Sequence, residues 1–175
     1  MWQTILDATG GSYVDVIAFR AAALVMLGRE AEGFGLIQSI SDHPDHVSEQ
    51  QLKMAVSVLP DKEGKFLIAV AGKLDKTSEN LHWLAQEAEK RGLISLAMPW
   101  VAIYFNRNRD EWGYRMYAKS LEALGSYPDA GQVLFDGLFQ FPTDEGLRQE
   151  AKSFVQRHHG QAPALEQMLK TGGQP

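Results

Sequence analysis

Five glycines recur along this chain at intervals typical of helical repeats. Successive glycines are 36, 28, 33 and 35 residues apart, and a period of this size is the sequence signature of arrays of helical hairpins. Because glycine commonly follows the last residue of an α-helix, each is expected to mark the elbow of a helix–turn–helix unit. The five residues are Gly28, Gly64, Gly92, Gly125 and Gly160.

Small side chains keep a constant distance from these glycines. Two helices that cross closely need small residues where their backbones approach, so the pattern predicts the contact points of paired helices. Seven residues before the glycines stand Ala21, Ser57, Ala85, Ala118 and Ser153. Five residues after them stand Gly33, Ala69, Ala97, Ala130 and, as the one large residue, Leu165.

The sequence also predicts where several helices begin. Ser48 and Gln51 have the spacing of a capping box, Thr77 or Ser78 can open the next helix, and Thr143 precedes two acids that favour a helix N-terminus. The segment from Lys65 to Gly72, KFLIAVAG, is predicted to be a helix because no other segment offers a strand to pair with it. Three prolines are expected in first helical turns, where the missing N–H costs little: Pro99, Pro128 and Pro163.

The unit from Glu111 to Thr143 resembles the tetratricopeptide repeat family. Ala118 and Ala130 match the small positions of that repeat, Gly125 and Tyr127 match its inter-helix turn, and Pro142 matches its closing proline. The chain departs from the family pattern at Gly137, where alanine is expected, and in the interval of 28 residues.

The resemblance implies a complete architecture. We expect an all-α fold: a right-handed α-solenoid of about five antiparallel helical hairpins. It is expected to form a single domain over residues 1–172, followed by a disordered tail at 173–175.

Composition narrows the classes of partner and location. The formal net charge is −5 and no segment is basic enough to neutralise many phosphates, so nucleic-acid binding is not expected. No apolar run approaches the length needed to span a bilayer, so membrane insertion is not expected either. The chain has no cysteine. We expect a cytoplasmic location by default, and a periplasmic one if this is a fragment of an exported protein.

Candidate catalytic chemistry is sparse. Asp42, His43, Asp45 and His46 offer metal ligands within five residues, but Pro44 makes this segment a loop with unconstrained geometry, so no metal site is predicted. No nucleophile elbow, phosphate-binding loop or dinucleotide-binding motif is present. We therefore predict a protein that is not an enzyme and needs no cofactor; an independent metal hydrolase is the least favoured hypothesis.

The resemblance also implies where a partner binds. In tetratricopeptide repeats the first helix of each unit lines a concave groove that holds a peptide. Trp112, Arg115 and Lys119 would form a cationic, aromatic spot there, suited to an acidic or carboxylate-terminated segment of a protein or peptide partner. The full predicted peptide-binding groove comprises Glu79, His82, Gln86, Glu89, Trp112, Arg115, Lys119 and Glu122.

The segment from Val14 to Leu27 is apolar on nearly every side, and its only charges are Asp15 and Arg20. A helix of this kind must be covered on all sides, so it predicts a homodimer or another docking surface. The favoured function is a protein interaction scaffold. The alternative is a helical accessory or oligomerisation domain of a larger enzyme or of a cell-envelope or secretion assembly.

Overall fold

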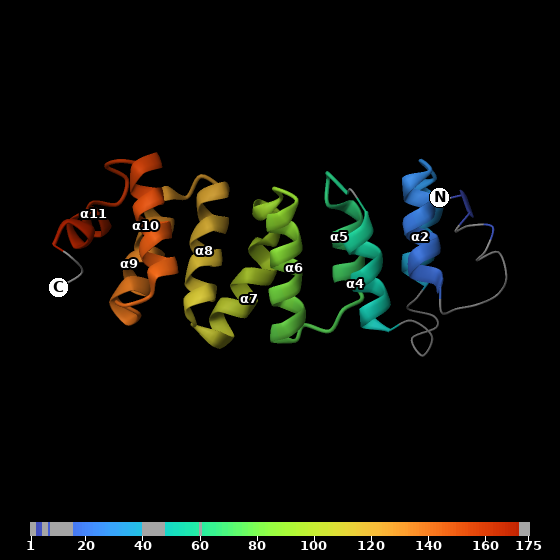
Figure 1. Cartoon of the computed structure of the whole chain (residues 1–175), viewed down its shortest axis with the longest axis horizontal. Helices are drawn as coiled ribbons and strands as arrows, with labels where there is room; N and C mark the ends of the chain where they lie inside the picture. The colour runs from blue at the N-terminus through green and yellow to red at the C-terminus, as the bar shows by residue number, and fades with distance from the viewer. Residues whose placement is uncertain (1–2, 5–6, 8–15, 40–47, 60, 172–175) are drawn as a thin grey trace. The chain divides into compact units, whose positions relative to one another are not determined.

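The computed structural model describes residues 3–4, 7, 16–39, 48–59 and 61–171. Within these residues the chain forms ten α-helices and one 3-10 helix, with no strand, which confirms the all-α class. The chain divides into two compact units, residues 1–76 and 77–175 (Figure 1). A single domain over residues 1–172 stays a prediction, and the predicted tail at 173–175 lies outside the described residues.

The described residues of the first unit include the helices α2 (Ile17–Met26), α3 (Glu30–Ser39), α4 (Glu49–Val58) and α5 (Lys65–Ala71). Consecutive helices pair, α2 with α3 and α4 with α5, and the two pairs meet through α2 with α4 and α3 with α5. The predicted helix after Gly64 is confirmed, with Phe66, Leu67 and Val70 fully buried.

The apolar helix of the first unit has a covered alanine face. The described part of this helix begins at Ile17 rather than at Val14. Ala21, Ala22 and Ala23 have no exposed surface, because the helix packs against both α3 and α4. The homodimer through this helix stays a prediction.

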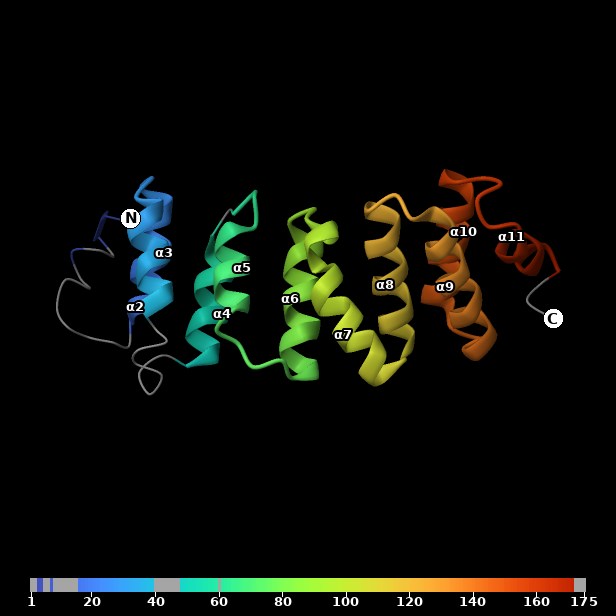
Figure 2. The same cartoon turned by 180° about the vertical axis from the view of Figure 1, so that it is seen from behind.

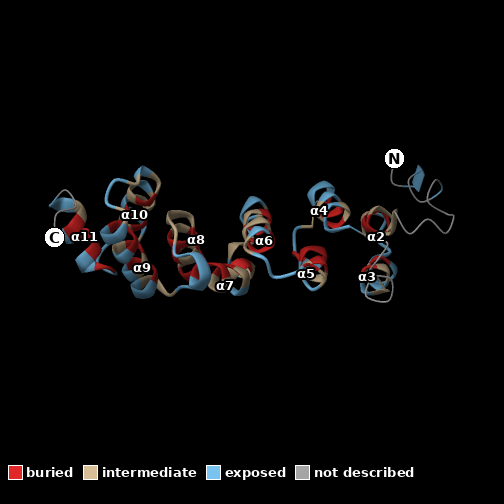
Figure 3. Cartoon of the chain, turned by 90° about the horizontal axis from the view of Figure 1, so that it is seen from below, coloured by how far each residue is buried: buried red, intermediate tan, exposed pale blue. Residues whose placement is uncertain are grey.

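The second unit contains three further helical pairs. The helices that open the pairs are α6 (Ser78–Lys90), α8 (Glu111–Ala123) and α10 (Glu145–Arg157); the helices that close them are α7 (Met98–Asn108), α9 (Tyr127–Gln140) and α11 (Pro163–Lys170). The 3-10 helix η4 (Ile94–Ala97) precedes α7. In both side views α8 lies between α6 and α10 (Figure 2), and the view from below places these three helices in one row and α7 and α9 in a second (Figure 3).

All five recurring glycines adopt the left-handed conformation, with φ between +71° and +83°, and no other glycine of the described residues does. At Gly125 the amide donates to the Glu122 carbonyl and the Ser126 amide donates to the Leu121 carbonyl, both at 2.9 Å. This is the Schellman arrangement that ends a helix at a glycine. The same pair of bonds forms at Gly28 and Gly92. Each of the five glycines lies between two helices, which confirms the predicted elbows, but Gly64 is the N-cap of α5 and does not directly follow the end of α4 at Val58.

Close helix approaches occur at several of the predicted small residues, but the prediction is wrong for Ser57, whose side chain is exposed on α4. A Cβ atom added to Gly33 would lie 2.8 Å from the Ala21 carbonyl oxygen, so α3 rests on the backbone of α2 at this point. Ala118 and Ala130 are likewise buried between α8 and α9. Close helix packing also explains Gly137, which stands where the repeat pattern has alanine. A Cβ atom added to Gly137 would lie 3.0 Å from the Cβ of Tyr114.

Helices in the second unit begin in one of two ways, which alternate along the chain. The opening helices begin with a side-chain cap: Thr77 on α6, Asp110 on α8 and Asp144 on α10. The closing helices α7, α9 and α11 carry the predicted prolines in their first turns. In the first unit, Ser48 and Gln51 form the predicted capping box. The cap of α10 falls on Asp144, one residue after Thr143, because the carboxylate accepts from the Leu147 amide at 2.6 Å.

Candidate functional site

The opening helices α6, α8 and α10 lie side by side, with α8 between the other two (Figure 2) and in contact with both. His82 faces Trp112 and Glu89 faces Lys119, each pair separated by 30 residues in the sequence. From α8 to α10, Lys119 faces Glu150. We call this surface the first-helix face; its contacting side chains are His82, Glu89, Trp112, Lys119, Glu122, Glu150 and Arg157.

One end of the first-helix face is aromatic. The rings of His82 and Trp112 are stacked with centroids 3.9 Å apart. The Tyr104 ring of α7 meets the edge of both rings, at 5.7 Å from His82 and 4.7 Å from Trp112. Its hydroxyl donates to Asp110 Oδ2 at 2.6 Å, so the residue that caps α8 also anchors the aromatic cluster.

This environment controls the ionisation of two rings. Burial lowers the pKa of His82, and the negative charge of Asp110 opposes that effect only in part. Burial and the hydrogen bond to Asp110 raise the pKa of Tyr104 to about 12. At neutral pH His82 is therefore an uncharged ring and Tyr104 remains a hydrogen-bond donor.

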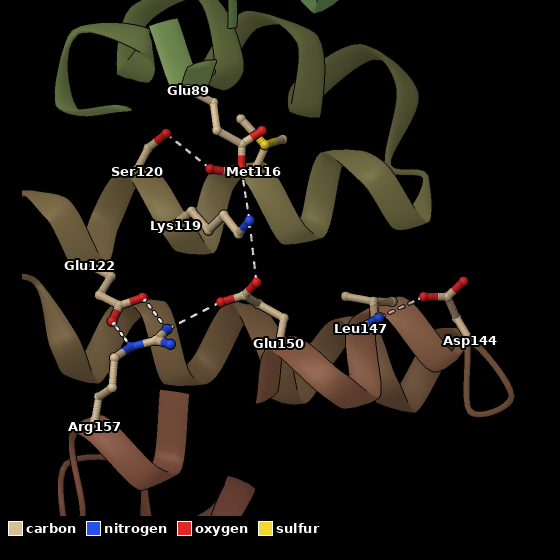
Figure 4. A network of polar contacts seen from close by, with 9 residues as sticks. All are labelled: Glu89, Met116, Lys119, Ser120, Glu122, Asp144, Leu147, Glu150 and Arg157. Atoms are coloured by element: carbon tan, nitrogen blue, oxygen red, sulfur yellow. Dashed lines mark hydrogen bonds and ion pairs between the residues drawn. The ribbon is translucent and has the colours of Figure 1, made fainter. Parts of the chain in front are cut away.

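The other end of the first-helix face is a ladder of ion pairs between three helices (Figure 4). Lys119 Nζ lies 2.8 Å from Glu89 Oε1 and 3.4 Å from Glu150 Oε2, so one ammonium joins α6, α8 and α10. Arg157 Nε and Nη2 donate to the two carboxylate oxygens of Glu122 at 2.8 and 3.0 Å. Arg157 Nη2 also donates to Glu150 Oε1 at 3.2 Å.

The ladder keeps its members charged. Burial works against ionisation of Glu122, but hydrogen bonds from Arg157 and His158 hold the pKa of this carboxyl below its usual range. Burial likewise opposes the charge of Lys119, and its contacts with Glu89 and Glu150 raise the pKa of the ammonium. Both groups therefore remain ionised at neutral pH.

A hollow of about 530 Å³ opens beside this ladder. His158 closes one side of it: its ring stacks on Tyr127 at 4.1 Å, and its Nε2 lies 2.7 Å from Glu122 Oε1. The residues around the hollow come from α6, α8 and the end of α10, from Gly92 and η4 after α6, and from the first residue of α9. They are Glu89, Gly92, Ile94, Lys119, Glu122, Ala123, Tyr127, Glu150, Arg157 and His158.

The structure brings most of the predicted groove residues together. His82 and Trp112 form the aromatic end, and Glu89, Lys119 and Glu122 form part of the ion-pair ladder. Glu79 is exposed and Gln86 half-buried, and neither lines the hollow.

The expected cationic spot of Trp112, Arg115 and Lys119 is divided. Trp112 is stacked on His82, and two carboxylates neutralise Lys119. Arg115 is half-buried and makes no hydrogen bond or ion pair with any described residue. It is therefore the member of the spot whose charge has no partner among the described residues.

Several residues of the site were not among the predicted groove residues, among them Tyr104, Glu150, Arg157 and His158. Facing residues of α6 and α8, such as Glu89 and Lys119, are 30 residues apart in the sequence. The same spacing counted onward from Lys119 leads to within one residue of Glu150, so it could have predicted this contact. His158 directly follows the last residue of α10. Its bond to Glu122 depends on the tertiary arrangement.

The loop residues Asp42, His43, Asp45 and His46, for which no metal site is predicted, lie outside the described residues. Among the residues that are described, no group of three or more His, Asp or Glu side chains could hold a metal ion. No helix in the same part of the chain is long and apolar enough to cross a membrane.

Comparison with known proteins returns no relative: no family model, curated protein or solved structure matches the chain. The resemblance to tetratricopeptide repeats therefore rests on the quoted residues and stays a prediction.

Proposed function

We propose that this protein is a non-enzymatic interaction scaffold that binds a peptide or helix of a partner protein along the first-helix face. The observation that carries the proposal is the hollow of about 530 Å³ beside the ion-pair ladder. Its size falls within the range of small-ligand and side-chain pockets, about 300 to 1,000 Å³. Because it opens onto the surface formed by three parallel helices, it suits a side chain of a longer bound segment.

The chemistry of the hollow supports recognition of a peptide. Apolar surface from Ile94, Ala123 and Tyr127 lies beside charged groups that are already held in place by one another. Groups that are fixed before binding lose little conformational entropy when a ligand arrives. The ladder therefore offers oriented donors and acceptors, and the apolar surface contributes burial of the ligand side chain.

The right-handed solenoid of about five hairpins belongs to the same proposal. The repeated offset between α6 and α8, and the pairing of consecutive helices in both units, are the arrangement that stacked repeats require. A cytoplasmic location remains part of this proposal.

A second candidate function is favoured by the surface of the first unit. Met54 and Val58 lie one turn apart on α4 and are each 50% exposed, and Ile68 on α5 is 49% exposed. Apolar side chains grouped in this way mark docking surfaces when they form a contiguous patch. This favours the alternative of an accessory or oligomerisation domain of a larger assembly.

A peptide-binding experiment tests the scaffold. Peptides selected from a random library on the full-length protein are titrated calorimetrically against the Ala123→Arg variant, which fills the hollow without removing any ion pair. The control is Gln156→Arg, an exposed α10 position that does not line the hollow. Loss of binding in Ala123→Arg alone is expected. Equal affinity of both variants and wild type would place the binding surface elsewhere.

A further inference from the structure

The exposed side of α9 carries a stripe of apolar side chains. Phe139 is 64% exposed, more than any other large apolar side chain of the described residues. Phe135 lies one turn earlier and is half-buried against the core, and Pro128 is exposed in the first turn of the helix. Because helix positions separated by one or two turns share a face, these three residues form one continuous stripe along α9.

A hollow of about 230 Å³ lies beside this stripe, between α9 and the start of α11. Its floor is closely packed, since a Cβ atom added to Gly131 would overlap the Cβ of Ala162. No charged residue lines the hollow. We call the stripe and the hollow together the α9–α11 groove, which is defined by Pro128, Gln132, Phe135, Phe139, Pro163 and Leu165.

The size of the hollow indicates what it can hold. Its volume is below the range of about 300 to 1,000 Å³ that is typical of small-molecule sites, so it suits a single apolar side chain. Phe139 stands one turn beyond the part of α9 that lines the hollow, where it can pack against a second side chain. Two apolar anchors one turn apart are the pattern of an amphipathic helix bound in a groove.

Acidic residues border the stripe along α9. Asp129 and Asp136 stand two turns apart on the exposed side of this helix, and α9 contains no basic residue. Gln132 Nε2 donates to Asp136 Oδ1 at 2.8 Å, and neither acid forms an ion pair with a described residue. Lys170, in the last turn of α11, does not line the hollow. The electrostatic complement of this border is therefore a row of basic side chains.

We propose that the α9–α11 groove is a second interaction surface, which binds a basic amphipathic helix of a partner protein. One apolar anchor of that helix fills the hollow and the next covers Phe139, while its basic residues face Asp129 and Asp136. The surface is independent of the function proposed for the first-helix face, because the hollow beside the ion-pair ladder and the hollow beside α11 share no residue.

Nuclear magnetic resonance of the ¹⁵N-labelled full chain tests this surface with two synthetic helices. One peptide repeats leucine and lysine in the pattern of an amphipathic helix, and the other has glutamate in place of each lysine. The lysine peptide is expected to cause saturable shifts of the amide signals of α9 and of residues 161–165. Shifts confined to α6, α8 and α10, equal binding of the two peptides, or no binding would each overturn the proposal.

Two exposed apolar residues provide a matched pair of variants. Phe139→Ala is expected to weaken binding of the lysine peptide by about tenfold. Leu124→Ala removes an apolar side chain that is 53% exposed and lies outside the groove, so it should leave the affinity unchanged. Because both positions are exposed, both variants should keep the melting temperature of the wild type. Equal affinities of the two variants would overturn the proposal.

Reversal of charge tests the acidic border. The double variant Asp129→Lys with Asp136→Lys should bind the glutamate peptide more tightly than the lysine peptide. The formal charge of the chain, −5, remains negative after this change, so attraction by net charge cannot produce the reversed preference. An unchanged preference for the lysine peptide would overturn the proposal. Ala123→Arg should leave this binding intact; its loss would overturn the independence of the two surfaces.

Discussion

The imidazole of His82 lies flat on the indole of Trp112, with ring centroids 3.9 Å apart and an interplanar angle of 15°. His82 belongs to α6 and Trp112 to α8, so the stack ties two successive helical pairs together. The Tyr104 ring, which is steeply inclined to both of these rings, closes the cluster from α7. Since the stacked imidazole has lost much of its hydration, its uncharged form is the one that the fold stabilises.

Stability should therefore fall on mild acidification. The folded pKa of His82 lies below its ordinary value of 6.5, so the unfolded chain binds a proton more readily than the folded one. This contribution to stability is complete above pH 6.5 and is lost as the pH falls through the lowered folded pKa. Urea unfolding between pH 7.5 and 5 should show the decline for the wild type and a shallower one for His82→Gln.

The control for this experiment is His159→Gln. The His159 side chain is 83% exposed, so its removal should leave the decline of the wild type in place. Because carboxyl groups titrate mostly below pH 5, their contribution to the change in stability falls outside the range from pH 7.5 to 5. An identical decline in His82→Gln and the wild type would show that protonation of His82 does not cause the loss of stability.

Two glycine-to-alanine substitutions in the first unit should have opposite effects. Gly28 has a φ of +77° and Gly35 is helical, and an added Cβ meets no atom within 4 Å at either site. Gly28→Ala should destabilise the unit by about 1 to 2 kcal/mol through backbone strain. Gly35→Ala should stabilise it by about 0.5 to 1 kcal/mol. Chemical denaturation measures both, and effects of the same sign would contradict the elbow at Gly28.

Enlarging the small residue at the centre of α8 should disrupt the α8 and α9 pair. Ala118 is 2% exposed, so Ala118→Leu should lower the free energy of unfolding by about 1 to 3 kcal/mol through overpacking. Ala123→Leu on the exposed end of the same helix is the control and should change it by less than about 0.5 kcal/mol. An unchanged melting temperature in Ala118→Leu would rule out the predicted repeat register.

The bidentate bond between Glu122 and Arg157 should couple α8 to α10. The Arg157 side chain is 47% exposed and that of Glu122 17%, so solvent screens the pair and the coupling free energy should be about 0.5 to 1 kcal/mol. A double-mutant cycle with Glu122→Gln and Arg157→Gln measures it. The coupling should shrink in 1 M salt; a value that salt does not change would show that the pair acts through packing.

Local chemistry explains why the elbows and helix starts could be predicted. Gly28, Gly92 and Gly125 end helices because residues with a Cβ avoid the left-handed conformation, and this preference acts without reference to distant residues. Ser48, Thr77 and the prolines act over one turn of helix in the same way. The positions of these features therefore follow from the order of residues along the chain.

The partners of charged side chains could not be predicted in this manner. Lys119 was expected to present a cation to a ligand, but Glu150 lies against it from a helix that begins more than twenty residues later. Arg115 stands on the same face and has no partner because Gly146 is opposite. Their roles differ through the register between α8 and α10, which no local preference reveals.

The amino-acid sequence alone was sufficient for the all-α class, for the helix boundaries near caps and prolines, and for several of the close contacts at small residues, because each depends on backbone preferences or on side-chain size within one hairpin. The distribution of charge over the first-helix face required the folded protein. Whether an arginine or a lysine is neutralised depends on the residue that a parallel helix places within about 4 Å, and that placement is a property of three helices packed together.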